Sequence, residues 1–194
     1  MASQTHAPLP ISIRRIAVVG ITGSGKSTLA GTLASLLHLP HIETDALNWQ
    51  PGWRPASVET LRRRVDAVTR ANAWVIDGNY REVRGIIWPR AQAVVWLDYP
   101  LLLILWRLWW RTWRRVLSKE RLWGTNYEKI LPQFFSQDSL FLWALKTYWR
   151  RKQEYSALFT DPEYAHLQFY HFTSPRQTKS WLDKIKPVSF RALD

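Results

Sequence analysis

The stretch from Gly20 to Thr28, GITGSGKST, limits the possible folds of this chain more than any other feature. It follows an apolar, β-branched run at 14–19 and opens a segment at 26–38 whose leucines recur on one helical face. The glycines of Gly20-x4-Gly25-Lys26-Ser27 let main-chain N–H groups turn inward, and a helix N-terminus favours anions. A strand, this turn and a helix in succession therefore predict a phosphate-binding loop, the P-loop, at the edge of a parallel sheet.

The residue types of this loop indicate the ligand. Lys26 is expected to reach the β- and γ-phosphates of a nucleoside triphosphate, and the Ser27 hydroxyl is expected to bind magnesium. ATP and Mg²⁺ are therefore the predicted cofactors. The residues expected to hold the nucleotide are Gly20, Thr22, Gly23, Ser24, Gly25, Lys26, Ser27 and Thr28.

The rest of the chain alternates between strand and helix patterns. Further strands are expected at 39–44, 73–76, 93–97 and 167–172, and helices at 57–71, after Pro100, at 139–159 and after Pro175. This order predicts a three-layer α/β P-loop NTPase fold, with a five-stranded parallel sheet covered by helices on both faces. We expect one domain over 1–194, a disordered lead-in at 1–12 and a helical lid at about 112–150.

Composition narrows the function classes. The chain has no cysteine, which excludes disulfides, thiolate zinc sites and cysteine nucleophiles and fits a cytoplasmic protein. Its net charge is +12, and residues 101–152 hold eleven of the 27 basic residues but three acids. Such a segment suits nucleotide phosphates, nucleic acid or an anionic membrane, or is a solvated surface. The apolar run that follows Pro100 is stopped by Arg107, too early for a membrane span.

A carboxylate is expected beside the magnesium, at the end of an apolar strand. Two residues qualify: Asp77, which follows Trp74-Val75-Ile76, and Asp98, which follows the strand at 93–97. We prefer Asp77, because Asp98 precedes Pro100 and suits the N-cap of the next helix.

Several segments resemble a known group of proteins. Asp77 to Arg81 is similar to the D-G-F-P-R segment of adenylate kinases, and Asp98-Tyr99-Pro100 with Arg107 and Arg111 is similar to their D-x-P-x6-R-x3-R segment. A closer resemblance is to the topology-modulation (FlaR-type) family of small P-loop proteins, within the nucleoside monophosphate kinase superfamily. The family pattern P-H-I-x-x-D-A-L-x-W-x-P-G-W, W-V-I-D-G-N-Y and W-L-D-x-P is matched at Pro40 to Trp53, Trp74 to Tyr80 and Trp96 to Pro100.

The resemblance implies roles for individual residues. Asp77 would orient the magnesium or its water, Arg81 would bind the phosphate of the acceptor, and Arg107 and Arg111 would clamp the transferring phosphoryl group. Asn79-Tyr80 replaces the Phe-Pro of adenylate kinases, and the lid lacks the four cysteines of zinc-lid forms.

The helix after Pro100 can also be analysed by geometry. At roughly 100° per residue, Arg107, Arg111, Arg114 and Arg115 share one stripe, and Trp106, Trp109, Trp110 and Trp113 share another sector. The arginine stripe suits an anion, and its alternatives are an exposed basic helix or a Trp/Arg helix on anionic lipid. We expect most of the tryptophans to lie in the core. Arg150 and Arg151 would reach the γ-phosphate from a closed lid or form a surface patch.

The acceptor side is less specific. If the second strand neighbours the first, Asp45 points into the cleft, where it would take a proton from a hydroxyl acceptor or bind a sugar, a base or a magnesium water. Trp49 and Trp53 would stack on a base or pack against the helix at 57–71. Arg81 and Arg84 favour an acceptor that already carries a phosphate.

Together these patterns predict ATP- and Mg²⁺-dependent phosphoryl transfer to a small acceptor, such as a nucleoside monophosphate or another phosphorylated metabolite. The predicted catalytic residues are Lys26, Arg107, Arg111 and Asp45. The predicted acceptor site consists of Asp45, Trp49, Arg81 and Arg84. The predicted metal site consists of Ser27 and Asp77. The alternative is a nucleic-acid-associated P-loop ATPase that modulates DNA topology, with the basic segment at 101–152 as its contact surface.

Overall fold

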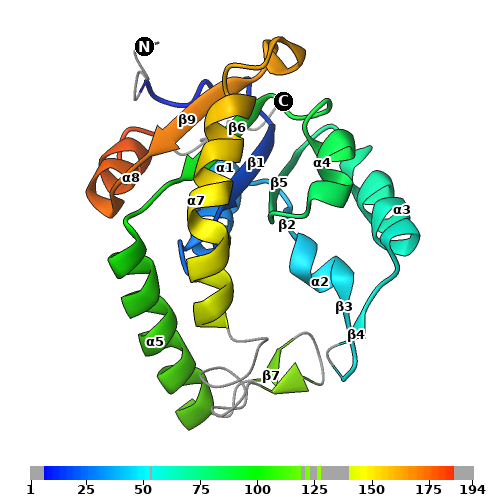
Figure 1. Cartoon of the computed structure of the whole chain (residues 1–194). Coiled ribbons are helices and arrows are strands. Elements are labelled where there is room, and N and C mark those ends of the chain that lie inside the picture. The colour runs from blue at the N-terminus through cyan, green and yellow to red at the C-terminus, as the bar shows by residue number, and fades with distance from the viewer. Residues whose placement is uncertain (1–6, 53, 119–120, 123–125, 128–139, 186–194) are drawn as a thin grey trace.

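The computed structural model describes residues 7–52, 54–118, 121–122, 126–127 and 140–185 of the 194-residue chain (Figure 1). Five parallel strands form the central sheet in the order β2-β5-β1-β6-β9. Their bounds are β1 Arg15–Gly20, β2 His41–Glu43, β5 Trp74–Asp77, β6 Ala93–Leu97 and β9 Gln168–Phe172. This confirms the predicted five-stranded α/β sheet, with each strand within about two residues of its expected place.

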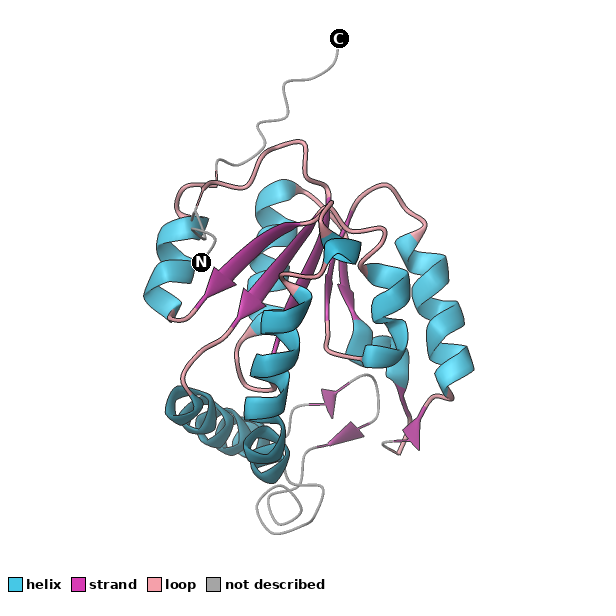
Figure 2. Cartoon of the chain, turned by 45° about the horizontal axis from the view of Figure 1, so that its top comes forward, coloured by secondary structure: helices cyan, strands magenta, loops and turns pink. Residues whose placement is uncertain are grey.

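Helices cover both faces of this sheet (Figure 2). They are α1 Lys26–Leu37, α2 Thr44–Asn48, α3 Val58–Thr69, α4 Arg81–Ile87, α5 Leu101–Ser118, α7 Leu140–Leu158 and α8 Pro175–Leu182, with a 3₁₀ turn at Pro162–Tyr164. The sequence pattern did not predict α2 and α4. Two short antiparallel pairs complete the fold: β3 Trp49–Gln50 with β4 Arg54–Pro55, and β7 Arg121–Leu122 with β8 Asn126–Tyr127.

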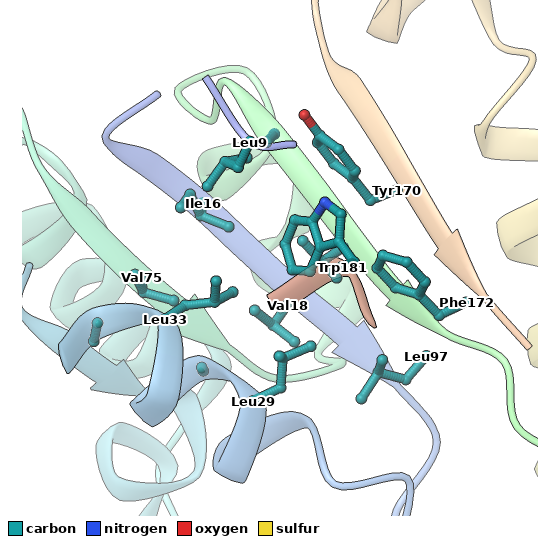
Figure 3. Packing of buried hydrophobic residues seen from close by; sticks show 14 of the residues in the cluster. Leu9, Ile16, Val18, Leu29, Leu33, Val75, Leu97, Tyr170, Phe172 and Trp181 are labelled. Atoms are coloured by element: carbon teal, nitrogen blue, oxygen red, sulfur yellow. The ribbon is translucent and has the colours of Figure 1, made fainter. Parts of the chain in front are cut away.

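Alternation along β1 divides the core into two layers. Ile16 and Val18 face the layer under α1 and α8, where Leu33 and Trp181 are buried (Figure 3). Ala17 and Val19, which alternate with them, face the opposite layer, under α3 and α4. A strand buried on both faces reads as a continuous apolar run, which is why the sequence identifies β1 and β6 so clearly.

The expected disordered lead-in is wrong for residues 7–12. Leu9 is buried in the core, and the Trp181 Nε1–H donates to the Ala7 carbonyl over 3.0 Å. Apolar contact and one satisfied main-chain carbonyl hold this segment against α8. Residues 1–6 lie outside the described residues.

The expectation that most tryptophans are core is wrong for α5. Trp74, Trp88, Trp96 and Trp181 are buried, but Trp106, Trp109, Trp110 and Trp113 are exposed. Ile104, Leu108 and Thr112 take the buried side of α5 instead. Helical periodicity grouped the α5 tryptophans on one side of the helix, but it did not show that this side faces solvent.

The predicted lid at 112–150 lies partly outside the described residues. Its range includes the end of α5 at Ser118, the β7–β8 pair and the start of α7 at Leu140, and α5 and α7 pack against each other. The residues at 119–120, 123–125 and 128–139 lie outside the described part of the chain.

The core account makes a stability prediction. Leu33→Ala on α1, at a fully buried position, should lower the free energy of unfolding by about 2–5 kcal/mol, because it removes buried methyl groups and leaves a cavity. Leu102→Ala on α5 is the matched control, since Leu102 is 81% exposed and its loss should cost less than about 0.5 kcal/mol. Urea unfolding followed by circular dichroism measures both; equal losses would contradict the assignment of the core.

Candidate functional site

The phosphate loop joins the carboxyl end of β1 to the first turn of α1. Gly23 and Gly25 have φ values of 81° and 92°, the left-handed region that glycine adopts at no steric cost. Space also requires glycine, since a Cβ at Gly23 would lie 2.7 Å from the Leu108 side chain. Within the described residues, no side chain caps the N-terminus of α1. Its first N–H groups therefore remain available for an anion.

A buried polar atom in the loop also suits a polar ligand. The Ser24 hydroxyl is fully buried and has no hydrogen-bond partner among the residues that the structure describes. A buried hydroxyl without a partner costs free energy, so such groups usually pair with a ligand or a water. The predicted nucleotide residues from Gly20 to Thr28 thus lie together around this turn.

Ser27 and Asp77 meet at the start of α1. The Ser27 hydroxyl donates to Asp77 Oδ2 over 2.6 Å, and His41 Nε2 lies 2.9 Å from Asp77 Oδ1. Parallel pairing of β1 with β5 places Asp77 beside Val18, close to the start of the loop. The hydrogen bond to Asp77 raises the pKa of His41, against the opposing effect of burial. A hydroxyl and a carboxylate are oxygen donors of the type that Mg²⁺ prefers, so these two residues fit the predicted metal site.

Asp98 is already paired with two side chains. Its Oδ2 lies 3.1 Å from Lys152 Nζ and 3.0 Å from His171 Nε2. It is not the N-cap that the sequence suggested, because the Ile104 N–H bonds to the Pro100 carbonyl and α5 begins after that residue. The geometry therefore favours Asp77 over Asp98 for the metal.

Helix α5 lies against the phosphate loop and brings Arg107 to it. The Arg107 Nη1 donates to the Ser24 carbonyl over 2.8 Å, and the guanidinium lies 5.1 Å from the centre of the Tyr99 ring. Burial raises the pKa of Tyr99. Arg111 lies one turn further along the same side of α5 and is half-buried. Arg107 and Arg111 thus lie on one side of α5, beginning at the loop.

The second strand does not neighbour the first, because β5 lies between β2 and β1. Asp45 follows β2 in α2 and is held by the segment after β5. Its carboxylate accepts a hydrogen bond from the Tyr80 hydroxyl over 2.7 Å, and the Asn48 side-chain amide donates to that hydroxyl over 3.2 Å. Burial, and then the charge of Asp45, raise the pKa of Tyr80. Trp49 is half-buried nearby in the chain, and Trp53 lies outside the described residues.

A small pocket of about 20 Å³, room for roughly one water, lies next to the segment that follows β5. Asn79, Tyr80, Arg81, Arg84 and Tyr155 are among its lining residues. Both arginines contact Glu154 Oε1, at 2.7 Å from Arg84 and 3.2 Å from Arg81. Arg81 is 62% exposed, so its guanidinium can still meet a ligand from solvent. The two arginines predicted for the acceptor are therefore at the same pocket.

Asn79 replaces the phenylalanine of the similar adenylate kinase segment, and the sequence alone indicated no role for it. Its Oδ1 accepts from the Gly20 N–H over 3.2 Å, and its side-chain amide donates to the Gly20 carbonyl. From α7, the Tyr155 hydroxyl donates to Asn79 Oδ1 over 2.9 Å, and Arg151 donates to the Asn79 carbonyl over 2.7 Å. Burial raises the pKa of Tyr155 to about 12, so it remains a donor at neutral pH. The available signal was a polar side chain two positions after a strand.

Comparison with known proteins identifies the fold. No family model matches the sequence, and a search of curated proteins found no match. Among solved structures, a shikimate kinase from Bacteroides thetaiotaomicron is similar with a TM-score of 0.54 and 18% identity, covering 88% of this chain and 95% of that one. A shikimate kinase from Aquifex aeolicus is similar with a TM-score of 0.50 and 14% identity, covering 87% and 92%. This chain therefore has the fold of P-loop kinases.

The packing of α5 on the loop makes a prediction about glycine. Gly23→Ala places a methyl group against Leu108, in a backbone conformation that alanine rarely adopts, and should weaken ATP binding by about tenfold or more. Gly85→Ala is the control, because nothing lies within 4 Å of its Cβ position and alanine favours the helix by about 1 kcal/mol. Isothermal titration calorimetry measures the ATP affinity of both variants, and thermal unfolding measures their stability. Unchanged ATP affinity in the Gly23 variant would contradict the claim that the loop needs glycine at this position.

Proposed function

We propose that this chain catalyses ATP- and Mg²⁺-dependent phosphoryl transfer to a small acceptor. The observation that carries the proposal is the group at the end of β1: a glycine turn with uncapped helical N–H groups, a hydroxyl–carboxylate pair at 2.6 Å, and a guanidinium at 2.8 Å from the loop. The P-loop kinase fold of the solved neighbours supports it.

Each component has a chemical role in this proposal. Lys26 and the loop amides hold the triphosphate of the donor, and Ser27 and Asp77 hold Mg²⁺. When bound, Mg²⁺ neutralises charge on the phosphate oxygens. Arg107 and Arg111 stabilise the charge that spreads over the transferring phosphoryl group in the transition state. The bond from the γ-phosphorus to the leaving oxygen breaks as the bond to the acceptor oxygen forms.

The acceptor site is proposed at the surface beside Arg81 and Arg84, next to a pocket too small to enclose a metabolite. These guanidiniums share Glu154, and an anionic group on the acceptor would bring a second negative charge to the exposed Arg81. This favours an acceptor that already carries a phosphate, such as a nucleoside monophosphate or another phosphorylated metabolite. A phosphate acceptor gives up no proton, whereas a hydroxyl acceptor would transfer its proton to Asp45. Trp49 would contact the base or sugar.

Membership of the topology-modulation family is a further part of the proposal. It is supported by the matched segments at 40–53, 74–80 and 96–100. A second candidate function, a P-loop ATPase that acts with nucleic acid, is favoured by the net charge of +8 over 101–152. ATP turnover that duplex DNA stimulates and small acceptors do not, with DNA binding that falls steeply with salt, would select this candidate.

The activity test is an ADP-release screen over nucleoside monophosphates, sugars and phosphorylated metabolites. We expect turnover that depends on one class of acceptor and is lost in Lys26→Ala. Turnover that no small acceptor raises above the rate of ATP hydrolysis would contradict the kinase assignment.

Kinetics of arginine variants test the assigned roles. Arg107→Ala and Arg111→Ala should each lower kcat by about 10³-fold or more, because each removes a charge that stabilises the transition state. Arg114→Ala is the matched control on the same helix, exposed to solvent, and should leave kcat unchanged.

Arg81→Ala should chiefly raise the KM for the acceptor, because this guanidinium is assigned to the acceptor and not to ATP. Steady-state kinetics with each substrate varied in turn measures the effect. A change confined to the KM for ATP would contradict the assignment.

A further inference from the structure

The outer face of α5 carries a cluster of apolar side chains that the proposed function does not use. We call it the tryptophan face; it consists of Leu102, Trp106, Trp109, Trp110 and Trp113. The four tryptophans are between 41% and 60% exposed, and Leu102 is 81% exposed. Proteins rarely leave so much contiguous aromatic surface in water, and such patches mark interaction sites.

The packing of α5 explains why these side chains point outward. At roughly 100° per residue, the tryptophan face lies opposite the side that carries the buried Ile104 and Leu108. The rings contact one another instead, with Trp109 6.2 Å from both Trp110 and Trp113. The core therefore cannot cover them without rotation of the helix, which would withdraw Leu108 from Gly23 and Arg107 from Ser24.

Positive charge accompanies this face. Helix α5 contains no acidic residue, and the exposed Arg114 lies one turn from Trp110. On α7, which packs beside α5 (Figure 1), Lys146 and Arg150 are exposed next to the exposed Leu145 and Trp149. A partner that covers the tryptophan face must therefore offer an apolar layer and negative charge together.

This requirement discriminates among three partners. A second copy of the chain would bring two acid-free, arginine-bearing helices together, and like charges across an interface oppose association. Nucleic acid supplies negative charge, but Trp109 and Trp113 meet edge-on at 61°, and the aliphatic Leu102 offers no ring for a base to stack on. An anionic bilayer supplies acyl chains for leucine, an interface that tryptophan favours, and headgroup charge for arginine.

We propose that the tryptophan face of α5 is a peripheral docking surface for an anionic membrane. The helix lies along the interface, its tryptophans enter the boundary between headgroups and acyl chains, and Arg114 remains among the headgroup phosphates. In the part of the chain that the structure describes, no helix is long and apolar enough to cross a bilayer, so the contact is with one leaflet. Arg107 points away from the tryptophan face and stays at the phosphate loop, so binding of lipid leaves the proposed catalytic site open.

Vesicle flotation of the full-length protein tests this proposal. The probes are vesicles of phosphatidylcholine alone and vesicles in which phosphatidylglycerol replaces part of it. We expect at least about tenfold stronger partitioning to the anionic vesicles, weakened by high salt, since each basic residue near the surface contributes severalfold. The double variant Trp106→Gln/Trp110→Gln should lose about tenfold or more, because it removes apolar area from the contact.

The matched control is Ile11→Gln/Val58→Gln, which replaces two similarly exposed apolar side chains elsewhere and should bind vesicles as the wild type does. Quenching of wild-type tryptophan fluorescence by brominated acyl chains provides a measurement that needs no variant. We expect quenching on anionic vesicles only.

Three results would overturn the proposal. The first is folded wild-type protein that stays off anionic vesicles or binds neutral ones equally well. The second is an unchanged vesicle affinity in the tryptophan variant, with DNA binding lost instead. The third is a dimer in sedimentation velocity that requires the tryptophans and does not bind vesicles. All of these readouts are independent of ATP turnover, so failure of the kinase proposal would leave this test intact.

Discussion

The contact between the phosphate loop and its two neighbours, β6 and α5, is the constraint on which the rest of the structure depends. A Cβ at Gly20 would lie 2.9 Å from the Leu97 carbonyl, and one at Gly23 would lie 2.7 Å from Leu108. The loop can keep its amides open only because it carries no side chains on these sides. The same closeness lets Arg107 reach the Ser24 carbonyl. Binding chemistry and packing therefore share one set of glycines.

Helix α7 supplies a second organising element at the carboxyl edge of the sheet. Within two turns, Arg151 and Tyr155 contact Asn79, Lys152 pairs with Asp98, and Glu154 pairs with Arg84. Asn79 follows β5, Asp98 follows β6, and Arg84 lies on α4. Because Asn79 also forms hydrogen bonds to Gly20, it connects α7 to the phosphate loop. This makes Asn79 a positioning residue for the phosphate loop in our account.

Part of the fold and of the candidate site was predictable from the sequence, because it depends on residues that are close together in the chain. The strand at 14–19, the turn and the amphipathic helix at 26–38 each have a short-range pattern, and together they fix the β1–loop–α1 unit. Asp77 was the preferred metal carboxylate from its place at a strand end, and the structure brings its Oδ2 to 2.6 Å from Ser27. The order of the strands depends on tertiary contacts: β5 lies between β2 and β1, so the expected pairing of the second strand with the first is not formed.

The remaining differences also arise from tertiary contacts. Periodicity placed the arginines and tryptophans of α5 in separate sectors but could not say which sector meets the core, because leucine and tryptophan both suit burial. The pairing of Asp98 with Lys152 and His171 joins residues from α7 and β9 that are distant in sequence. Burial of Leu9 depends on α8, the last helix of the described chain.

The most direct test of the central claim is calorimetric titration of ATP into the purified protein, with and without Mg²⁺. We expect one ATP per chain, bound more tightly with Mg²⁺ than with a chelator. Ser27→Ala and Asp77→Asn should remove the magnesium-dependent gain while leaving the affinity in chelator nearly unchanged. No heat of binding to the folded wild-type protein, or an equal magnesium-dependent gain in both variants, would contradict the claim that this loop and this carboxylate hold a magnesium-bound triphosphate.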